Sequence, residues 1–288
     1  MAEDRLVLLT VHAHPDDESS KGASTVARYH DEGVETVLVC CTGGEEGEIL
    51  NPALDSDEIR ANLPAVRRDE LYKAGAVIGF DHIELLGYRD SGMAGTPANE
   101  RPDCFARADA DEAVGKLVTL MRRYKPDVVI TYGDEQEFYP HPDHLRVHDV
   151  TLVAFRAAGD AQAFPEAGEA WLPKKLYYSV LSFDRMKRLA EAFEQEGLEF
   201  PFGERWKELP DNDHRITTRI DVSKWAAVRG EALRSHATQI DPESPFWFGL
   251  SDATQNELNG EEDYVLAESN LGVDGPENDL FAGLRGNG

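Results

Sequence analysis

The segment Leu6–Val11 (LVLLTV) is a run of apolar and branched side chains, and His12–Glu18 (HAHPDDE) follows it directly. An apolar run of this length that ends in a polar loop is typical of a strand buried on both faces of a parallel sheet. Ser20–Asp31 predicts a helix, and Glu35–Cys41 predicts a second buried strand. The three elements form a βαβ unit whose first strand ends in a cluster of histidines and carboxylates.

The same alternation continues along the chain. Further helices are predicted over Glu58–Gly79, Ala110–Tyr124, Phe183–Glu196 and Lys224–His236, and further strands over Ile83–Leu86, Asp127–Tyr132, Lys175–Leu181 and Arg215–Val222. This order predicts an α/β fold with a Rossmann-like, mostly parallel sheet, helices on both faces, and an active site at the carboxyl ends of the strands. Without a linker-like segment, residues 1–288 are expected to form a single domain, with 271–288 as a flexible tail.

The charge balance excludes some classes of partner. The chain has 55 acidic and 29 basic residues, a net charge of −26, which repels nucleic acid and anionic membrane surfaces. It lacks an apolar run of roughly 18 residues and a signal peptide pattern. The three cysteines, Cys40, Cys41 and Cys104, predict no disulfide framework, so a cytoplasmic protein is expected. The composition sets no oligomeric state.

Two polar clusters predict a metal site. His12–Glu18 follows the first strand, and Tyr139–His144 (YPHPDH) follows the strand Asp127–Tyr132. Imidazole nitrogens and carboxylate oxygens from two loops on one sheet edge suit Zn²⁺ with an open position for water, and Fe²⁺ accepts the same ligands. His148, four residues after His144, offers an alternative helix-borne ligand pair. His12 alternates with His14 and is expected to be structural.

With these motifs the sequence resembles a known family. His14–Glu18 and His141–His144 resemble the zinc-dependent de-N-acetylases related to N-acetylglucosaminyl-phosphatidylinositol deacetylase. The resemblance spans most of residues 5–240. The branch of the family that handles mycothiol and its precursor is indicated by Thr42–Glu48, Arg67–Leu71 and Arg89–Met93, and within it Ser19–Gly22 and Tyr139–His141 look more like enzymes that act on mycothiol S-conjugates.

The resemblance implies a role for each matching residue. The ligands of one Zn²⁺, with Fe²⁺ possible, would be His14, Asp17 and His144. The catalytic residues would be Asp16 as general base, His141 as a cation near the leaving nitrogen, and Tyr139 as a hydroxyl that stabilises the oxyanion. The substrate would be bound by Lys21, Glu48, Arg67 and Asp90. The alternatives are that Arg67 lies on a solvated helix face and that Lys21 is exposed without contacts.

The implied activity is hydrolysis of the amide between the glucosamine of a mycothiol S-conjugate and its N-acetylcysteine, which gives glucosaminyl-inositol and a mercapturic acid in detoxification. The partner would be this small thiol conjugate. Residues after about 240 would complete the pocket, with Phe246–Phe248 either beside the group on sulfur or in the core. One alternative is deacetylation of N-acetylglucosaminyl-inositol or another small N-acetylglucosamine conjugate. The other is a nucleotide-binding regulatory module, which the absence of Gly-x-Gly-x-x-Gly after the first strand disfavours.

Overall fold

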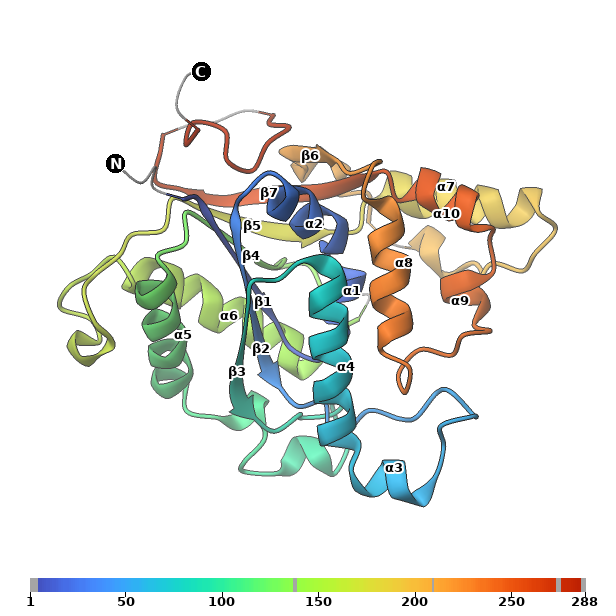
Figure 1. Cartoon of the computed structure of the whole chain (residues 1–288), viewed down its shortest axis with the longest axis horizontal. Helices are drawn as coiled ribbons and strands as arrows, with labels where there is room; N and C mark the ends of the chain where they lie inside the picture. The colour runs from blue at the N-terminus through green and yellow to red at the C-terminus, as the bar shows by residue number, and fades with distance from the viewer. Residues whose placement is uncertain (1–4, 137–138, 209, 273–275, 286–288) are drawn as a thin grey trace.

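A seven-stranded sheet forms the centre of the computed structural model, which describes residues 5–136, 139–208, 210–272 and 276–285 (Figure 1). The strands lie in the order β3-β2-β1-β4-β5-β7-β6. Their bounds are β1 Val7–His12, β2 Glu35–Thr42, β3 His82–Tyr88, β4 Val128–Tyr132, β5 Lys175–Val180, β6 Thr218–Asp221 and β7 Glu261–Ser269. The first five are mutually parallel, whereas β7 runs antiparallel to both β5 and β6. The predicted mostly parallel α/β sheet is confirmed.

Helices cover both faces of this sheet (Figure 1). The longer ones are α2 Ala23–Asp31, α4 Leu63–Ile78, α5 Ala110–Tyr124, α6 Pro142–Ala157, α7 Phe183–Gln195 and α8 Ala226–Ser235, and the short ones are α1 Asp17–Ser20, α3 Asp57–Ala61, α9 Pro245–Phe248 and α10 Asp252–Leu258. Leu9 and Val11 of β1 pack with α5 and α6, whereas Leu8 packs with α2, α4 and α8. Since successive strand side chains point to opposite faces, this double burial explains the continuous apolar run of β1.

Several predicted element boundaries are wrong for local reasons. The helix expected from Glu58 is divided at Asn62 into α3 and α4, and Pro64 stands in the first turn of α4, where a missing N–H costs little. The helix expected from Ser20 begins at Ala23, because Gly22 has a φ of 89° and interrupts it. The strand β7 was not predicted, since its first residues, Glu261–Asp263, are acidic.

The chain near its C-terminus packs against the sheet, unlike the flexible tail expected from composition over 271–288, of which 273–275 and 286–288 lie outside the described residues. Leu280 and Phe281 are fully buried, and the Phe281 ring lies 5.1 Å from that of Tyr29. Glu277 accepts a hydrogen bond from Nζ of the fully buried Lys175 at 2.7 Å. An apolar anchor and a buried ion pair thus hold this segment in place.

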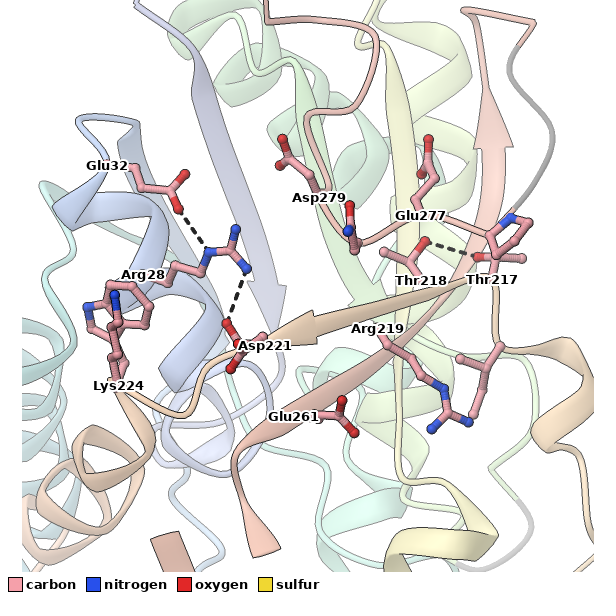
Figure 2. Close-up of a pocket in the computed structure, with 14 residues that line it drawn as sticks. Arg28, Glu32, Thr217, Thr218, Arg219, Asp221, Lys224, Glu261, Glu277 and Asp279 are labelled. Carbon is pink, nitrogen blue, oxygen red and sulfur yellow. Dashed lines mark hydrogen bonds and ion pairs between the residues drawn. The ribbon is translucent and has the colours of Figure 1, made fainter. Parts of the chain in front are cut away.

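A polar cavity of about 710 Å³ lies between α2, β6 and this segment (Figure 2). Arg28 donates hydrogen bonds to Glu32 at 2.8 Å and to the carbonyl of Asp221 at 3.1 Å, and both are drawn in Figure 2. Asp279 on the same wall accepts from Tyr29. The clusters of metal-ligating side chains found among the described residues lie elsewhere. This cavity is therefore not the site predicted from the two histidine motifs.

We predict that Phe281→Ala lowers the free energy of unfolding by about 3–5 kcal/mol, because it leaves a cavity beneath the sheet where a fully buried ring packs. Urea denaturation of the full chain measures the change. Val153→Ala on the exposed side of α6 is the matched control and is expected to change stability by less than about 0.5 kcal/mol. Equal stability of Phe281→Ala and the parent would show that the segment does not support the fold.

Candidate active site and metal centre

A cavity of about 1300 Å³ opens at the carboxyl ends of the parallel strands. Its walls come from the segments that follow β1 to β5 and from α7, α8 and α9. All of the residues predicted from sequence for the site line it: His14, Asp16, Asp17, Lys21, Glu48, Arg67, Asp90, Tyr139, His141 and His144. The two sequence clusters meet because β1 and β4 are neighbours in the sheet, and ligands bind where the strand order reverses in this way.

The loop after β1 holds Asp16 in an unusual backbone conformation, with φ at 123°. A non-glycine residue in this region costs of order 1–3 kcal/mol and persists only where its surroundings enforce it. The backbone N–H of Asp16 donates to Glu18 Oε2 at 2.9 Å. Arg67 Nη2 donates to the carbonyl of Pro15 at 2.6 Å and to Asp16 Oδ2 at 3.0 Å. These contacts aim the Asp16 carboxylate into the cavity.

Behind this loop, Glu18 forms a fully buried ion pair with His236, at the C-terminal end of α8. The Oε1–Nε2 distance is 2.6 Å. Burial disfavours both charges, but their attraction lowers the pKa of Glu18 and raises that of His236. Sequence reasoning missed His236, which belongs to no local motif. The pair fixes Glu18, and through it the backbone of Asp16.

One group of metal-ligating atoms consists of His14, Asp17 and His144, all buried and within 4.8 Å of one another. Asp17 Oδ2 lies 3.3 Å from both His14 Nδ1 and His144 Nε2. Although burial opposes ionisation, Lys21 and His144 hold the pKa of Asp17 well below its usual value. Two imidazoles and a charged carboxylate facing a cavity fit a divalent cation such as Zn²⁺ with room for water.

A second group consists of His14, Asp90, His141 and Asp143. Asp143 Oδ2 lies 3.2 Å from His14 Nε2 and accepts the Ser91 N–H at 2.9 Å, and Asp143 Oδ1 accepts the Ser91 hydroxyl. Asp143 is fully buried and is not part of the cavity wall. Its geometry suits a residue that orients His14 rather than one that binds a metal open to substrate. The first group therefore fits a catalytic metal better.

His141 caps the N-terminus of α6, where its Nδ1 accepts the backbone N–H of Asp143 at 3.2 Å. Burial, together with His14 and His144, lowers the pKa of His141 to about 4. This lowered pKa favours a neutral ring, whereas the resemblance implies a cation, and the charge of His141 in the working site stays a prediction. The Tyr139 ring, 54% exposed, stacks on His141 with centroids 6.0 Å apart. Both residues line the cavity.

The four residues expected to bind substrate differ in their surroundings. Arg67 is buried and also donates to the carbonyl of Gly44 at 2.6 Å, so the interpretation as a solvated helix face is wrong. Lys21 Nζ donates to Asp17 Oδ1 at 2.7 Å, so it is not without contacts. Asp90 accepts the N–H of Gly92 and lies 3.5 Å from His14. Glu48 is exposed on the cavity wall.

Two other histidines considered from the sequence, His12 and His148, lie outside both groups. His148 Nδ1 lies 3.1 Å from the carbonyl oxygen of Tyr132, so the predicted alternative pair of His144 and His148 does not form. His12 packs edge-on against the Tyr132 ring. Tyr132, which sequence reasoning missed, donates its hydroxyl to Asp17 Oδ2 at 2.7 Å. Tyr132 is the last residue of β4, and its place at the carboxyl end of a parallel strand could have indicated that it lies at the site.

Comparisons with known proteins agree with this geometry. Residues 9–155 match the family model described as GlcNAc-PI de-N-acetylase. The chain belongs to this family. It is 44% identical to a mycothiol S-conjugate amidase of Streptomyces coelicolor, over 99% of both chains. It is also 41% identical to a 1D-myo-inositol 2-acetamido-2-deoxy-alpha-D-glucopyranoside deacetylase of Geodermatophilus obscurus, over 97% of this chain and 98% of the other.

The fold also resembles a solved structure, the N,N'-diacetylchitobiose deacetylase from Pyrococcus horikoshii, with a TM-score of 0.62 at 18% identity over 91% of this chain and 83% of the other. The family consists of metal-dependent amide hydrolases, and the buried His/Asp group can hold a metal. Membership in it contradicts the nucleotide-binding alternative. No helix within the described ranges is both long and apolar enough to cross a membrane.

We predict that His144→Ala weakens zinc binding by more than about 100-fold, because losing a ligand costs more than losing an outer partner, which costs about 10- to 100-fold. Metal analysis after dialysis against a zinc buffer measures the loss. His141→Ala, which alters the neighbouring ring at the N-terminus of the same helix, is the control and is expected to retain metal. Retention in His144→Ala with loss in His141→Ala would assign the metal to the second group.

We further predict that His236→Ala lowers the free energy of unfolding by about 3–5 kcal/mol at neutral pH, because it leaves the Glu18 carboxylate buried without its cation. The double variant Glu18→Gln/His236→Ala removes that charge and keeps an acceptor for the Asp16 N–H, so it should recover part of the loss. Urea denaturation compares them. A double variant less stable than His236→Ala would show that the pair does not act as a unit.

Proposed function

We propose that this chain is a zinc-dependent amidase of mycothiol S-conjugates, which cleaves the amide between glucosamine and the S-substituted N-acetylcysteine. The observation that carries the proposal is the cluster of His14, Asp17 and His144. It lies with Asp16 on the wall of a cavity of about 1300 Å³, which is large enough for a substrate on the scale of a mycothiol conjugate. The similarity to a mycothiol S-conjugate amidase over nearly the whole chain supports the substrate class. The buried free thiols of Cys40, Cys41 and Cys104 suit a cytoplasmic location.

The residues that would hold the metal are His14, Asp17 and His144, with one Zn²⁺ per chain or Fe²⁺ in its place. A divalent cation there would supply Lewis-acid chemistry, making water a stronger acid and polarising the amide carbonyl. Tyr132 and Lys21 hold the Asp17 carboxylate, and Asp143 holds His14. These outer contacts set the orientation of the ligands in advance.

Asp16 is the general base in this proposal. Its carboxylate receives a proton from the attacking water while the water oxygen bonds to the amide carbon. When the C–N bond breaks, the same carboxyl returns that proton to the departing glucosamine nitrogen, and the acid product retains the water oxygen. Arg67 keeps Asp16 directed at the cavity throughout, by its contact with Asp16 Oδ2. The proton balance closes without a charged His141.

His141 and Tyr139 stabilise the charge that develops on the carbonyl oxygen. The Nε2–H of the neutral His141 ring and the hydroxyl of Tyr139 donate hydrogen bonds that strengthen as the oxygen becomes anionic. The hydrogen bond from the Asp143 N–H to His141 Nδ1 fixes the tautomer in which Nε2 is the donor. A half-exposed Tyr139 can move with the substrate at the cavity mouth.

Two parts of the cavity wall, called the two arms below, would favour the substrate of the amidase over that of the deacetylase. Glu48 and Asp90, after β2 and β3, would bind the sugar and inositol, with Arg67 beside them. The second arm would consist of the aromatic residues Phe183, Phe202, Phe246 and Trp247, of which the last two come after residue 240. An acetyl group would leave this arm unfilled, whereas a substituted cysteine would fill it. Deacetylation remains the second candidate because of the 41% identical deacetylase.

We predict that the zinc-loaded protein hydrolyses a bimane-labelled mycothiol conjugate with a kcat/KM at least about tenfold higher than its kcat/KM for N-acetylglucosaminyl-inositol, because only the conjugate contacts the second arm. Chromatographic detection of the freed amine serves for both substrates. Asp16→Asn in the same assay should lower kcat about 10²- to 10⁴-fold with its metal retained. A preference for N-acetylglucosaminyl-inositol would make the chain a deacetylase.

A further inference from the structure

Arg185 and Arg229 are partly buried arginines that line the cavity together with the aromatic residues of the second arm. Arg185 lies on α7 and Arg229 on α8. They share this wall with Trp247 and other aromatic residues and with Glu262 and Asp263 at the start of β7. Cations in an aromatic pocket have no role in the amide hydrolysis described above.

Arg229 is the less satisfied of the two. Arg185 donates to Asn259 Oδ1. Arg229, by contrast, makes no hydrogen bond or ion pair with any residue that the structure describes, and its Nε is buried without an acceptor. Its guanidinium carbon lies 5.4 Å from the centroid of the Trp247 ring. Burial, and then Arg185, lower the pKa of Arg229 to about 9 against the effect of Glu262, so the group is charged at neutral pH.

Two other arginines of the cavity wall, Arg67 and Arg215, already have oxygen partners. Arg67 is held by Gly44, Pro15 and Asp16, and Arg215 pairs with Asp134 and Glu135. A guanidinium has five N–H donors, and burying them without acceptors is costly. The matching acceptor for such a planar group is a carboxylate, which it binds in a bidentate manner. Arg229 is therefore placed to receive an anionic group from a ligand in this arm.

The neighbours of Arg229 indicate which part of the substrate reaches it. The metal-ligating residues follow β1 and β4, and Glu48 and Asp90 follow β2 and β3, whereas Arg229 on α8 lies beside Trp247 of α9 and near Glu262 at the start of β7. With the sugar in the first arm, as in the proposed function on which this step rests, the cysteine and its sulfur substituent extend into the second. Trp247 offers that substituent an aromatic face, and Arg229 offers it a cation.

We propose that Arg229 and Trp247 form a subsite that selects mycothiol S-conjugates whose sulfur substituent carries a carboxylate on an aromatic or similarly flat group. The substrates favoured by this subsite are adducts of electrophiles that already bear an acid group. Arg185 adds positive charge to the same wall and receives no direct contact in this assignment.

The experiment compares two conjugates of matched shape, S-(4-carboxybenzyl)-mycothiol and S-benzyl-mycothiol, with the zinc-loaded full chain. The wild-type kcat/KM is expected to favour the carboxybenzyl conjugate by at least about tenfold, as for a charge-assisted hydrogen bond. Arg229→Gln should bring the ratio of the two values close to one. Arg234→Gln, on the exposed side of the same helix, is the matched control and should leave the ratio at its wild-type value.

The outcomes separate this subsite from the proposed function. Hydrolysis of both conjugates with no preference in the wild type, or with a preference that persists in Arg229→Gln, overturns the subsite and leaves the amidase intact. Hydrolysis of N-acetylglucosaminyl-inositol with neither conjugate cleaved overturns the amidase and the subsite together. Should Arg229→Gln fail to fold, Arg229→Lys keeps the charge and loses the planar fork. Its ratio is expected to fall between one and the wild-type value, and an unchanged ratio overturns bidentate recognition.

Discussion

The buried carboxylate of Asp17 joins the parts of the site that come from different strands. Its Oδ2 accepts the Tyr132 hydroxyl and the His14 N–H and lies 3.3 Å from His144 Nε2, while Lys21 binds Oδ1. A buried carboxylate is stable only when such partners surround it. They can do so here because β1 and β4 are adjacent and parallel, so that both histidine motifs start from one point on the sheet edge.

A second constraint is the strained backbone at Asp16. The free energy that this conformation costs is offset by the nearby Glu18 on α1 and by two distant residues, Arg67 on α4 and His236, which supports Glu18. In the proposed mechanism Asp16 receives and returns a proton within one turnover, and for this it must keep its position relative to the carbonyl carbon. The strain is therefore a consequence of rigid positioning. The ion pair of Glu18 and His236 contributes to that positioning by holding the acceptor of the Asp16 N–H.

Sequence reasoning succeeded where the information is local. The apolar run Leu6–Val11 predicts a strand that is buried on both faces. The residue types and spacing of the two histidine motifs predict a metal site in the loops that follow two strands. It failed where a partner is distant, because pattern and propensity do not encode contacts across the fold. His236 forms an ion pair with Glu18, which is 218 residues away in the sequence. The strand β7 begins with acidic residues, so its pairing with β5 could not be predicted from its composition. The anchor at Phe281 was missed for the same reason.

The charge of His141 illustrates the same limit within a motif. The resemblance implies a cation beside the leaving group. The His141 ring is buried, however, and its centroid lies 4.5 Å from that of His14 and 5.3 Å from that of His144. Burial, together with the neighbouring His14 and His144, lowers the pKa of His141 and disfavours its charged form. In the proposed mechanism a neutral His141 would still polarise the carbonyl through Nε2–H, and proton delivery would be left to Asp16. The roles proposed for these two residues thus rest on how they are packed, which the motif alone does not determine.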